Sequence, residues 1–466
     1  MSDATVLLPA ELLADIFDMC VPPGEDGVNG LSDTTTADEE VERLAKQYLL
    51  DLSQVCSRWH SIVMDTPLLW RIIVVDTTLW LDVDVDIPIL IQLVQNSLDR
   101  GKSCPLVLQV AVDDDESYSF EVLRLLSQHA PRWYKVHFWS EFQSMRSIAS
   151  AKGNLGLLTE LKLSQIDEWG EFDVFELAPS LTNLSITSWG TFVLSIPWNQ
   201  IKHLRYHNYE ANDIVNTLSI LRNDLPRRAQ CKLFMSAIHM DSEIDLPPIE
   251  SDMYGLWLTI KVTAETTASA LLGAILACLT LHGVKQLGLE GKTSSNSPLS
   301  WSQSQFLAFA SRSSLHTSLR HLEICRTTIT DEELLDCLTI LPLLEELLVD
   351  DNPRAPHTVI TDAFLRRLIL TPSPSSLVPR LNFLCLTSLL NFSDSVLWDV
   401  IASRGVPAKP DAFVFEMKIY WLSGRSRELS ADLISRSLEL EENGDLNFTY
   451  KPDPEEAALA EADEES

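Results

Sequence analysis

The sequence predicts an α/β protein in which a small all-helical N-terminal region precedes an array of strand–helix repeats. Apolar residues in the first 72 positions recur at helical spacing, and short leucine phrases of strand length recur along the middle of the chain. A chain of 466 residues is also longer than a single compact hydrophobic core usually accommodates, whereas an elongated repeat array has no such limit on length. We therefore expect three parts, residues 1–72, 73–445 and 446–466.

The first predicted helix begins just after Pro9. The apolar positions 12, 13, 16, 17 and 20 share one face of a helix with 3.6 residues per turn. A second apolar series steps by three or four residues and predicts a second amphipathic helix. This series comprises Leu44, Tyr48, Leu52, Val55, Trp59 and Ile62. Thr66 followed by Pro67 predicts the N-cap and first position of a third helix.

Three short helices cannot enclose this much apolar surface by themselves, so we expect part of it to meet the rest of the chain or another protein. The three segments also carry ordered motifs: Leu-Pro-x-Glu-Leu-Leu with Ile-Phe from Leu8, Val-Cys-x-x-Trp from Val55, and Thr-Pro-x-Leu-Trp from Thr66. With these motifs the segment resembles an F-box of the form common in fungal F-box proteins. The resemblance covers about the first 72 residues.

The resemblance implies a Skp-type adaptor and, through it, a cullin-based SCF ubiquitin ligase as partners. It assigns adaptor contacts to three groups of residues: Leu8, Pro9, Leu12, Leu13, Ile16 and Phe17; Leu52, Val55, Cys56 and Trp59; and Pro67, Leu69 and Trp70. Residues 21–42 depart from the family pattern, because they lengthen a connection that is usually short. We call residues 21–42 the acidic insert. An ordinary N-terminal helical cap is the alternative interpretation.

Leucine phrases of the type Leu-x-x-Leu-x-Leu predict the strands of the middle region. They start at Leu158, Leu181, Ile201, Val284, Leu319, Leu344 and Leu381. The middle leucines step by 23, 20, 83, 35, 25 and 37 residues, and weaker strands around Leu233 and Leu258 divide the step of 83 into 29, 25 and 29. Earlier strands are expected at 72–75, 106–112 and 134–139. These spacings are typical of leucine-rich repeats.

Helical phrases lie between these strands, such as 331–338 with Thr330 as N-cap and Glu333 at its third helical position. One strand–helix unit cannot bury its apolar side alone, so stacked units should form a solenoid with a curved parallel sheet. An F-box followed by such repeats resembles F-box leucine-rich-repeat substrate receptors. The resemblance implies that the solenoid selects the protein to be ubiquitinated.

Composition and charge favour a cytoplasmic or nuclear protein and disfavour several other classes. The chain begins without a signal-peptide pattern, its longest apolar run (268–281) is too short for a membrane span, and its eight cysteines include no Cys-x-x-Cys. The net charge is −32, of which residues 24–42 and 453–466 each contribute seven acids and no base, so we expect both to be flexible. Nucleic-acid binding is disfavoured because no basic run exceeds two residues.

The sequence gives no support for an enzyme or a cofactor. Gly291-Lys292-Thr293 follows a predicted strand, but Gln286 occupies the position where a phosphate-binding loop needs its first glycine. His203 and His207 are four residues apart, yet Arg205 between them disfavours a divalent metal. We therefore expect no catalytic, cofactor or metal site. An enzyme with a site scattered along the sequence is the remaining catalytic alternative.

The side chains of each strand that alternate with its leucines should project from the open face of the sheet and contact a protein substrate. The predicted substrate-binding residues are Lys162, His203, Arg205, His207, Glu290, Glu323, Glu346 and Asp350. The last three favour a substrate with a basic segment. We accordingly expect the substrate-recognition subunit of an SCF ligase, and a leucine-rich-repeat scaffold that joins no ligase is the alternative.

Overall fold

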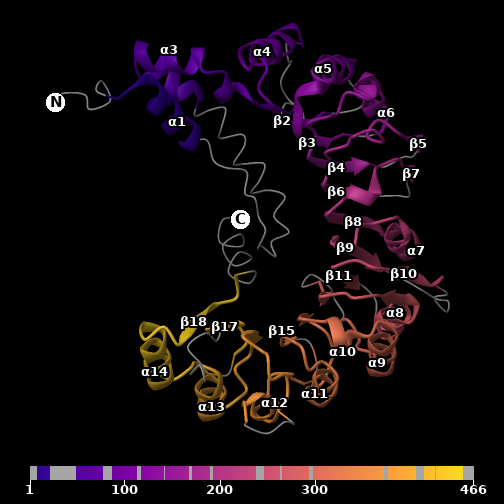
Figure 1. Ribbon diagram of the computed structural model, residues 1–466, viewed down its shortest axis with the longest axis vertical. Coiled ribbons are helices and arrows are strands. Elements are labelled where there is room, and N and C mark those ends of the chain that lie inside the picture. The colour runs from indigo at the N-terminus through magenta and orange to yellow at the C-terminus, as the bar shows by residue number, and fades with distance from the viewer. Residues whose placement is uncertain are drawn as a thin grey trace. The chain divides into compact units, whose positions relative to one another are not determined.

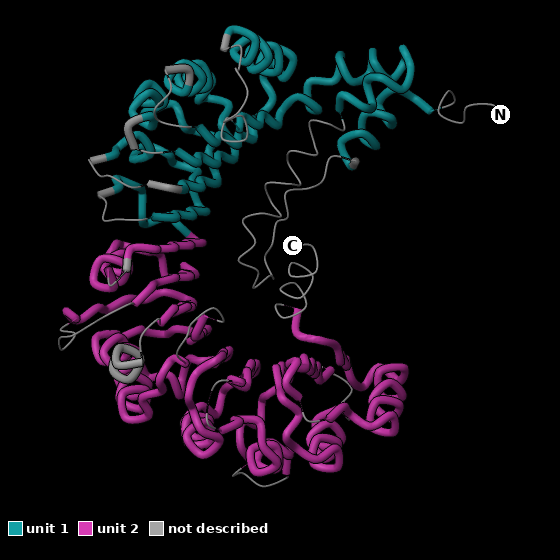
Figure 2. The backbone as a smooth tube through the Cα atoms, turned by 180° about the vertical axis from the view of Figure 1, so that it is seen from behind, with its two compact units in different colours: residues 1–201 teal, residues 202–466 magenta. Residues whose placement is uncertain are grey.

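The computed structural model describes residues 8–20, 49–76, 87–112, 117–140, 142–166, 171–188, 193–211, 213–237, 246–262, 265–292, 298–353, 355, 357–371, 376–405, 414–425 and 427–454. These residues belong to two compact units, residues 1–201 and 202–466 (Figure 2). The predicted acidic insert 21–42 lies outside the described residues, as do positions 455–466 of the predicted tail.

Unit 1 contains a helical N-terminal region followed by a parallel sheet (Figure 1). Its helices and 3-10 helices are α1 (Ala10–Cys20), α3 (Ser57–Asp65), η2 (Pro67–Trp70), α4 (Ile87–Arg100), α5 (Ser117–Ser127), η4 (Ala130–Arg132), α6 (Phe142–Met145), η5 (Arg146–Ala151) and η6 (Trp198–Gln200). Its strands are β1 (Ile72–Asp76), β2 (Leu106–Ala111), β3 (Trp133–Trp139), β4 (Glu160–Ile166), β5 (Glu171–Phe172), β6 (Asn183–Ser188) and β7 (Val193–Leu194). Strands β1, β2, β3, β4 and β6 pair in that order, all parallel.

Unit 2 alternates strands and helices. Its strands are β8 (His203–Ala211), β9 (Gln230–Ala237), β10 (Ile249–Ser251), β11 (Gly255–Val262), β12 (Leu279–Leu281), β13 (Gln286–Gly291), β14 (His321–Cys325), β15 (Glu346–Asp350), β16 (Phe383–Ser388), β17 (Phe415–Trp421) and β18 (Leu446–Pro452). Its helices are α7 (Ile214–Ser219), η7 (Ile220–Arg222), α8 (Glu265–Cys278), α9 (Gln303–Arg312), α10 (Leu315–Ser318), α11 (Asp331–Thr339), α12 (Asp362–Leu368), α13 (Asp394–Arg404) and α14 (Ala431–Glu442).

The main sheet of unit 2 is parallel throughout, and each strand pairs with the next main strand along the chain. Helices α8, α9 and α11–α14 lie on one face of this sheet (Figure 1). The phrase leucines, such as Leu322 and Leu347, point to that face and are fully buried. Their side chains and the apolar sides of the helices form the core, and the opposite face carries no helix within the described part of unit 2. We call this opposite side the helix-free face.

The predicted strands are all present, but several predicted boundaries are wrong. Each phrase strand begins about two residues after its first leucine, as in β14. Strands β17 and β18 were not predicted, and β18 extends the sheet to Pro452, beyond the expected boundary at residue 446. Asp453 is also buried, and its backbone N–H donates to the carbonyl of Trp421 at 3.0 Å. The apolar run at 268–281 divides between α8, which ends at Cys278, and Leu279–Leu281, which pairs with β10.

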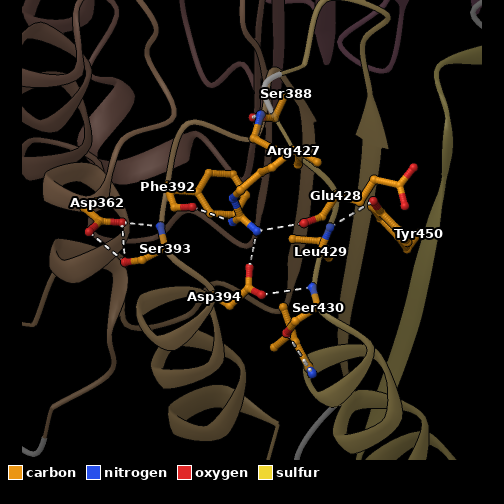
Figure 3. A network of polar contacts seen from close by, with 12 residues as sticks. Asp362, Ser388, Phe392, Ser393, Asp394, Arg427, Glu428, Leu429, Ser430 and Tyr450 are labelled. Carbon is orange, nitrogen blue, oxygen red and sulfur yellow. Dashed lines mark hydrogen bonds and ion pairs between the residues drawn. The ribbon is translucent and has the colours of Figure 1, made fainter.

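Polar links join the starts of four successive helices in unit 2. Each of α11, α12 and α13 has an aspartate as its first residue, and this carboxylate accepts a hydrogen bond from the N-cap residue of the following helix. Thr361 Oγ1 donates to Asp331 at 2.7 Å, Ser393 N donates to Asp362 at 2.6 Å, and Ser430 N donates to Asp394 at 2.9 Å. Figure 3 shows the last two links. We call this series the N-cap ladder.

The N-cap ladder stabilises each helix start and fixes the spacing between neighbouring helices. A carboxylate near a helix N-terminus interacts favourably with the helix dipole. The hydroxyls of Thr330, Thr361 and Ser430 also accept from a backbone N–H of their own helix, whereas the Ser393 hydroxyl donates to Asp362 instead. Thr330 and Glu333 form the predicted capping box at the first helix of the series. Arg427 lies between Phe392 and Asp394 and forms an ion pair with Asp394 at 2.6 Å (Figure 3). One polar pattern thus recurs in step with the strand–helix unit.

Candidate functional site

The N-terminal helical region is built on a small apolar core. Its buried members are Leu13, Phe17, Leu49, Ile62, Val63 and Leu69. Helix α1 starts at Ala10, as predicted from Pro9, and places Leu13 and Phe17 four residues apart on its inner side. The ring of Phe17 packs on the ring of Trp59, with centroids 4.8 Å apart. One stripe of α1 therefore packs against α3 to form the core.

A second apolar stripe on α1 faces outward. Leu12, Ile16 and Met19 follow the spacing i, i+4 and i+7, and their exposed fractions are 49%, 38% and 74%. Leu50, Val55 and Leu68 add exposed apolar side chains on the following segments. Single exposed apolar residues are normal, but a helix that exposes three along one stripe offers a surface to a partner. We call Leu12, Ile16 and Met19 the outer stripe.

The second predicted helix is interrupted. Residues 49–55 are helical, Cys56 is extended, and α3 begins at Ser57, whereas Leu44 and Tyr48 lie outside the described residues. The thiol of Cys56 accepts a hydrogen bond from the backbone N–H of Trp59 at 3.5 Å, so Cys56 caps α3. The apolar spacing continued across this break, which explains why periodicity predicted one helix.

The third predicted helix is a short 3-10 helix, and Thr66 does not cap it. Pro67 occupies its start as expected, but the Thr66 hydroxyl donates backward to the carbonyl of Ile62 at 2.6 Å. Trp70 Nε1 donates to the carbonyl of Val63 at 2.8 Å, and the Arg100 guanidinium lies 4.5 Å from the Trp70 ring. Trp70 therefore joins the helical region to α4.

The predicted adaptor residues divide into two groups. Pro9, Leu12, Ile16, Val55 and Cys56 are exposed and can contact a partner directly. The remaining predicted residues are buried or half-buried and support the surface from below: Leu8, Leu13, Phe17, Leu52, Trp59, Pro67, Leu69 and Trp70. Sequence reasoning missed Met19, Leu50 and Leu68. Met19 was detectable, because it lies three residues after Ile16 on the same stripe.

The predicted substrate residues are not uniformly exposed. Lys162 in unit 1 is half-buried, and its Nζ lies 3.9 Å from Glu160. His203 and Arg205 in unit 2 are exposed, whereas the His207 ring lies 5.7 Å from the Phe234 ring. The predicted substrate residues therefore lie in both units, and they differ in how exposed they are.

The acidic residues predicted to face a substrate are largely satisfied within the chain. Glu323 is only 3% exposed, so the expectation that its carboxylate projects into solvent is wrong. Trp257 Nε1 donates to this carboxylate at 3.1 Å. Glu290 pairs with Arg326 at 2.8 Å, and Arg326 lies 4.0 Å from Asp350. Burial raises the pKa of Asp350 to about 6, and the charge of Arg326 opposes this rise.

His321 connects two of these acids. Its Nδ1 lies 2.7 Å from Glu346, and its Nε2 lies 3.7 Å from Glu323. Burial lowers the pKa of His321, but the carboxylates of Glu323 and Glu346 outweigh burial and raise this pKa to about 9. His321 is therefore a cation at neutral pH, and its charge compensates the two acids. A basic partner would find only Glu346 exposed in this group.

Comparison with known families supports the N-terminal assignment. Residues 5–76 match the family model described as F-box-like, and this range spans the whole helical region up to the end of β1. No curated protein matches the chain. Within the described ranges, no helix has both the length and the apolar content needed to cross a bilayer.

Proposed function

We propose that this chain, which carries an F-box-like domain at residues 5–76, is the substrate-recognition subunit of an SCF ubiquitin ligase. F-box domains generally bind Skp-type adaptors, and the adaptor would connect this chain to a cullin. The observation that carries the proposal is the outer stripe of Leu12, Ile16 and Met19 within the matched range. Burying these side chains against an adaptor would remove their apolar surface from water, the main favourable term in most protein association.

We also infer that the remainder of the chain forms a leucine-rich-repeat solenoid that holds the substrate. Three features support this inference: one main strand per repeat, parallel pairing in chain order within each unit, and the N-cap ladder of unit 2. Repeat arrays of this kind offer an extended sheet face to partners. The helix-free face of unit 2 is the face that we propose for substrate binding.

The proposed mechanism is proximity, with catalysis supplied by other subunits. The F-box-like domain would hold the chain on the ligase while the array holds the substrate. Joining both events in one chain raises the effective concentration of the substrate near the ubiquitin carrier. No bond is made or broken by the residues of this chain in this proposal.

Affinity purification followed by mass spectrometry tests the ligase assignment. The wild-type chain should capture a Skp-type adaptor and a cullin, and a Leu12→Asp/Ile16→Asp variant should lose both. Leu438→Asp on α14 is the matched control, because Leu438 is a similarly exposed apolar residue and receives the same change. Capture of neither adaptor nor cullin by the wild-type chain would favour a scaffold that joins no ligase.

Proximity labelling with and without proteasome inhibition then tests the receptor role. A substrate should accumulate in the labelled set when the proteasome is inhibited. This accumulation should disappear in the Leu12→Asp/Ile16→Asp variant, which would still hold the substrate but could not deliver it. A role in degradation would be contradicted if the labelled amount of every partner stayed the same under proteasome inhibition and in the variant.

A further inference from the structure

The helix-free face of β8, β9, β11 and β13 differs in charge from the rest of this acidic chain. Because side chains alternate along a strand, four positions per strand lie on this face, counting Lys292 directly after β13. The positions are His203, Arg205, His207 and Tyr209; Gln230, Lys232, Phe234 and Ser236; Gly255, Trp257, Thr259 and Lys261; and Gln286, Gly288, Glu290 and Lys292. Four of the sixteen are Lys or Arg, and one is acidic.

The single acid on this surface is already compensated. Glu290 accepts a hydrogen bond from Thr259 Oγ1 at 2.9 Å and pairs with Arg326 at 2.8 Å. By contrast, Lys232 and Lys261 form no ion pair within the described part of the chain. Arg205 is the direct neighbour of Lys232 on β8. Burial and the Arg205 charge lower the pKa of Lys232, and the carboxylates of Glu323 and Glu290 oppose this shift. This local excess of positive charge lies in a chain with a net charge of −32.

Two aromatic side chains, Trp257 and Phe234, lie beside the cations. Trp257 lies flat on the sheet, because a Cβ at Gly288 would come within 2.1 Å of its ring and one at Gly255 within 2.8 Å. The two glycines therefore leave the room that the indole occupies. Lys232 Nζ lies 5.5 Å from the Trp257 ring, and Lys292 Nζ lies 5.9 Å from the Phe234 ring. Trp257 is half-buried, so part of it remains accessible to a partner.

The register places the cations in two rows. Arg205 and Lys232 are direct neighbours on β8 and β9, and Lys261 and Lys292 lie four residues further along the strands on β11 and β13. Four residues of strand span about 13 Å. The same distance separates side chains i and i+4 of an extended peptide. Side chain i+2 would then face the row between the cations, which contains His207, Phe234, Thr259 and Glu290, whereas Trp257 lies in the same row as Arg205 and Lys232.

We propose that this face, defined by Arg205, Lys232, Trp257, Lys261 and Lys292, binds an extended segment of a partner protein with two acidic side chains four residues apart and an apolar side chain midway between them. The proposal rests on the receptor role proposed above and specifies the class of substrate. It replaces the basic segment expected from sequence, because the acids that would have bound such a segment are paired within the chain.

A nucleic acid fits this face less well than an acidic peptide. Its phosphates form a continuous row, whereas the two rows of cations are separated by Phe234, Thr259 and the acidic Glu290. Glu323 lies on the strand next to Gly288 and further opposes a continuous polyanion. A short peptide can place its two carboxylates at the cations and leave the positions between them neutral.

Fluorescence anisotropy with the full-length chain tests the proposal directly. The probe is a labelled peptide Ser-Ser-Glu-Ser-Leu-Ser-Glu-Ser-Ser, and its comparison replaces both Glu by Gln. We expect the Glu peptide to bind about tenfold more tightly than the Gln peptide, and this preference should shrink as NaCl rises from about 50 to about 300 mM. Equal binding of the two peptides, or no binding of either, would overturn the proposal.

Variants locate the binding and separate this test from the ligase assignment. Lys232→Ala/Lys261→Ala should weaken Glu-peptide binding about tenfold, whereas Arg227→Ala/Arg228→Ala removes two exposed cations from a turn outside the face and should leave it unchanged. Both variants should keep adaptor binding, so a failure here leaves the ligase assignment standing. Equal weakening by both variants would overturn the proposal.

Three further results would assign the face to another occupant and overturn the proposal. Displacement of the peptide by a single-stranded oligonucleotide at equal concentration would identify the face as a polyanion site. Peptide binding that arises only after removal of residues 455–466 identifies the chain's own acidic tail as occupant. Loss of peptide binding as the chain forms dimers at higher concentration identifies a second copy.

Discussion

Helix α1 and helices α11–α14 use their outward sides in opposite ways. In α11–α14 the start of each helix is linked to the next by the N-cap ladder, and the large apolar side chains mostly face the sheet. In α1 the inner stripe of Leu13 and Phe17 supplies the core, and a complete second stripe remains exposed. Helices α11–α14 thus expose little apolar surface, whereas α1 exposes a continuous apolar stripe. Apolar surface that folding does not bury is surface available for a partner.

The magnitude of the open surface supports this distinction. Full burial of one large apolar side chain contributes about 1.5–3 kcal/mol relative to exposure. Burying the exposed apolar surface of Leu12, Ile16 and Met19 would therefore contribute several kcal/mol that folding of the isolated chain does not gain. An interface with a partner can gain part of this free energy. A single exposed residue such as Leu438 on α14 has no such neighbours on the same stripe.

The largest expected effect is on the inner stripe. Phe17→Ala should destabilise the helical region by about 3–5 kcal/mol, because it leaves a cavity beside Trp59. The variant should lose adaptor binding together with cooperative unfolding of the region, measured by chemical denaturation. Normal stability in Phe17→Ala would break the distinction between an inner and an outer stripe.

A smaller effect on stability is expected when pH changes the charge of His321, which pairs with two acids of unit 2. Because the pKa of His321 is raised to about 9, its contribution to stability is complete below pH 6.5 and is lost as the pH rises through about 9. The loss should approach about 2–3 kcal/mol.

His321→Gln is the control for this pH effect. The free energy of unfolding should fall between pH 6.5 and pH 9 in the wild-type chain and should fall less in His321→Gln. Subtracting the two profiles removes the contribution of other groups that titrate in this range. Identical profiles would show that the charge of His321 does not hold Glu323 and Glu346 in place.

The smallest effect is expected in the N-cap ladder. Asp362→Ala removes the acceptor of the Ser393 N–H and hydroxyl, and it should cost about 1–2 kcal/mol. Asp432→Ala on α14 removes an exposed ion pair with Arg436 and should cost less than about 0.5 kcal/mol. Thermal unfolding of both variants sharpens the comparison. An equal change in both would show that the ladder adds no stability beyond a surface charge.

Local pattern was enough to predict most of the elements. Proline and apolar spacing predicted the start of α1 at Ala10, and the leucine phrases predicted the main strands through β16. The N-cap ladder was also visible as Thr330-Asp331, Thr361-Asp362 and Ser393-Asp394, each at a helix start, although it was not recognised. Strands β17 and β18 were missed because their apolar residues do not follow the leucine phrase.

Local pattern could not predict which side chains would be covered by distant residues. Alternation correctly places Glu323 on the helix-free face, but Trp257, 66 residues earlier, lies against its carboxylate. The same holds for Asp350 beside Arg326. In the helical region, periodicity predicted the faces of the helices but not the break at Cys56, because the side chain that makes the break also fits the apolar spacing.

The most direct test of the central claim measures adaptor affinity and stability on the same variants. Purified Skp-type adaptor is titrated into the wild-type chain, Ile16→Asp and Leu438→Asp by calorimetry, and each melting temperature is recorded. We expect Ile16→Asp to weaken binding about a hundredfold, equivalent to about 2.8 kcal/mol, without a change in melting temperature. Leu438→Asp should bind like the wild-type chain. Unchanged affinity in Ile16→Asp would contradict the account.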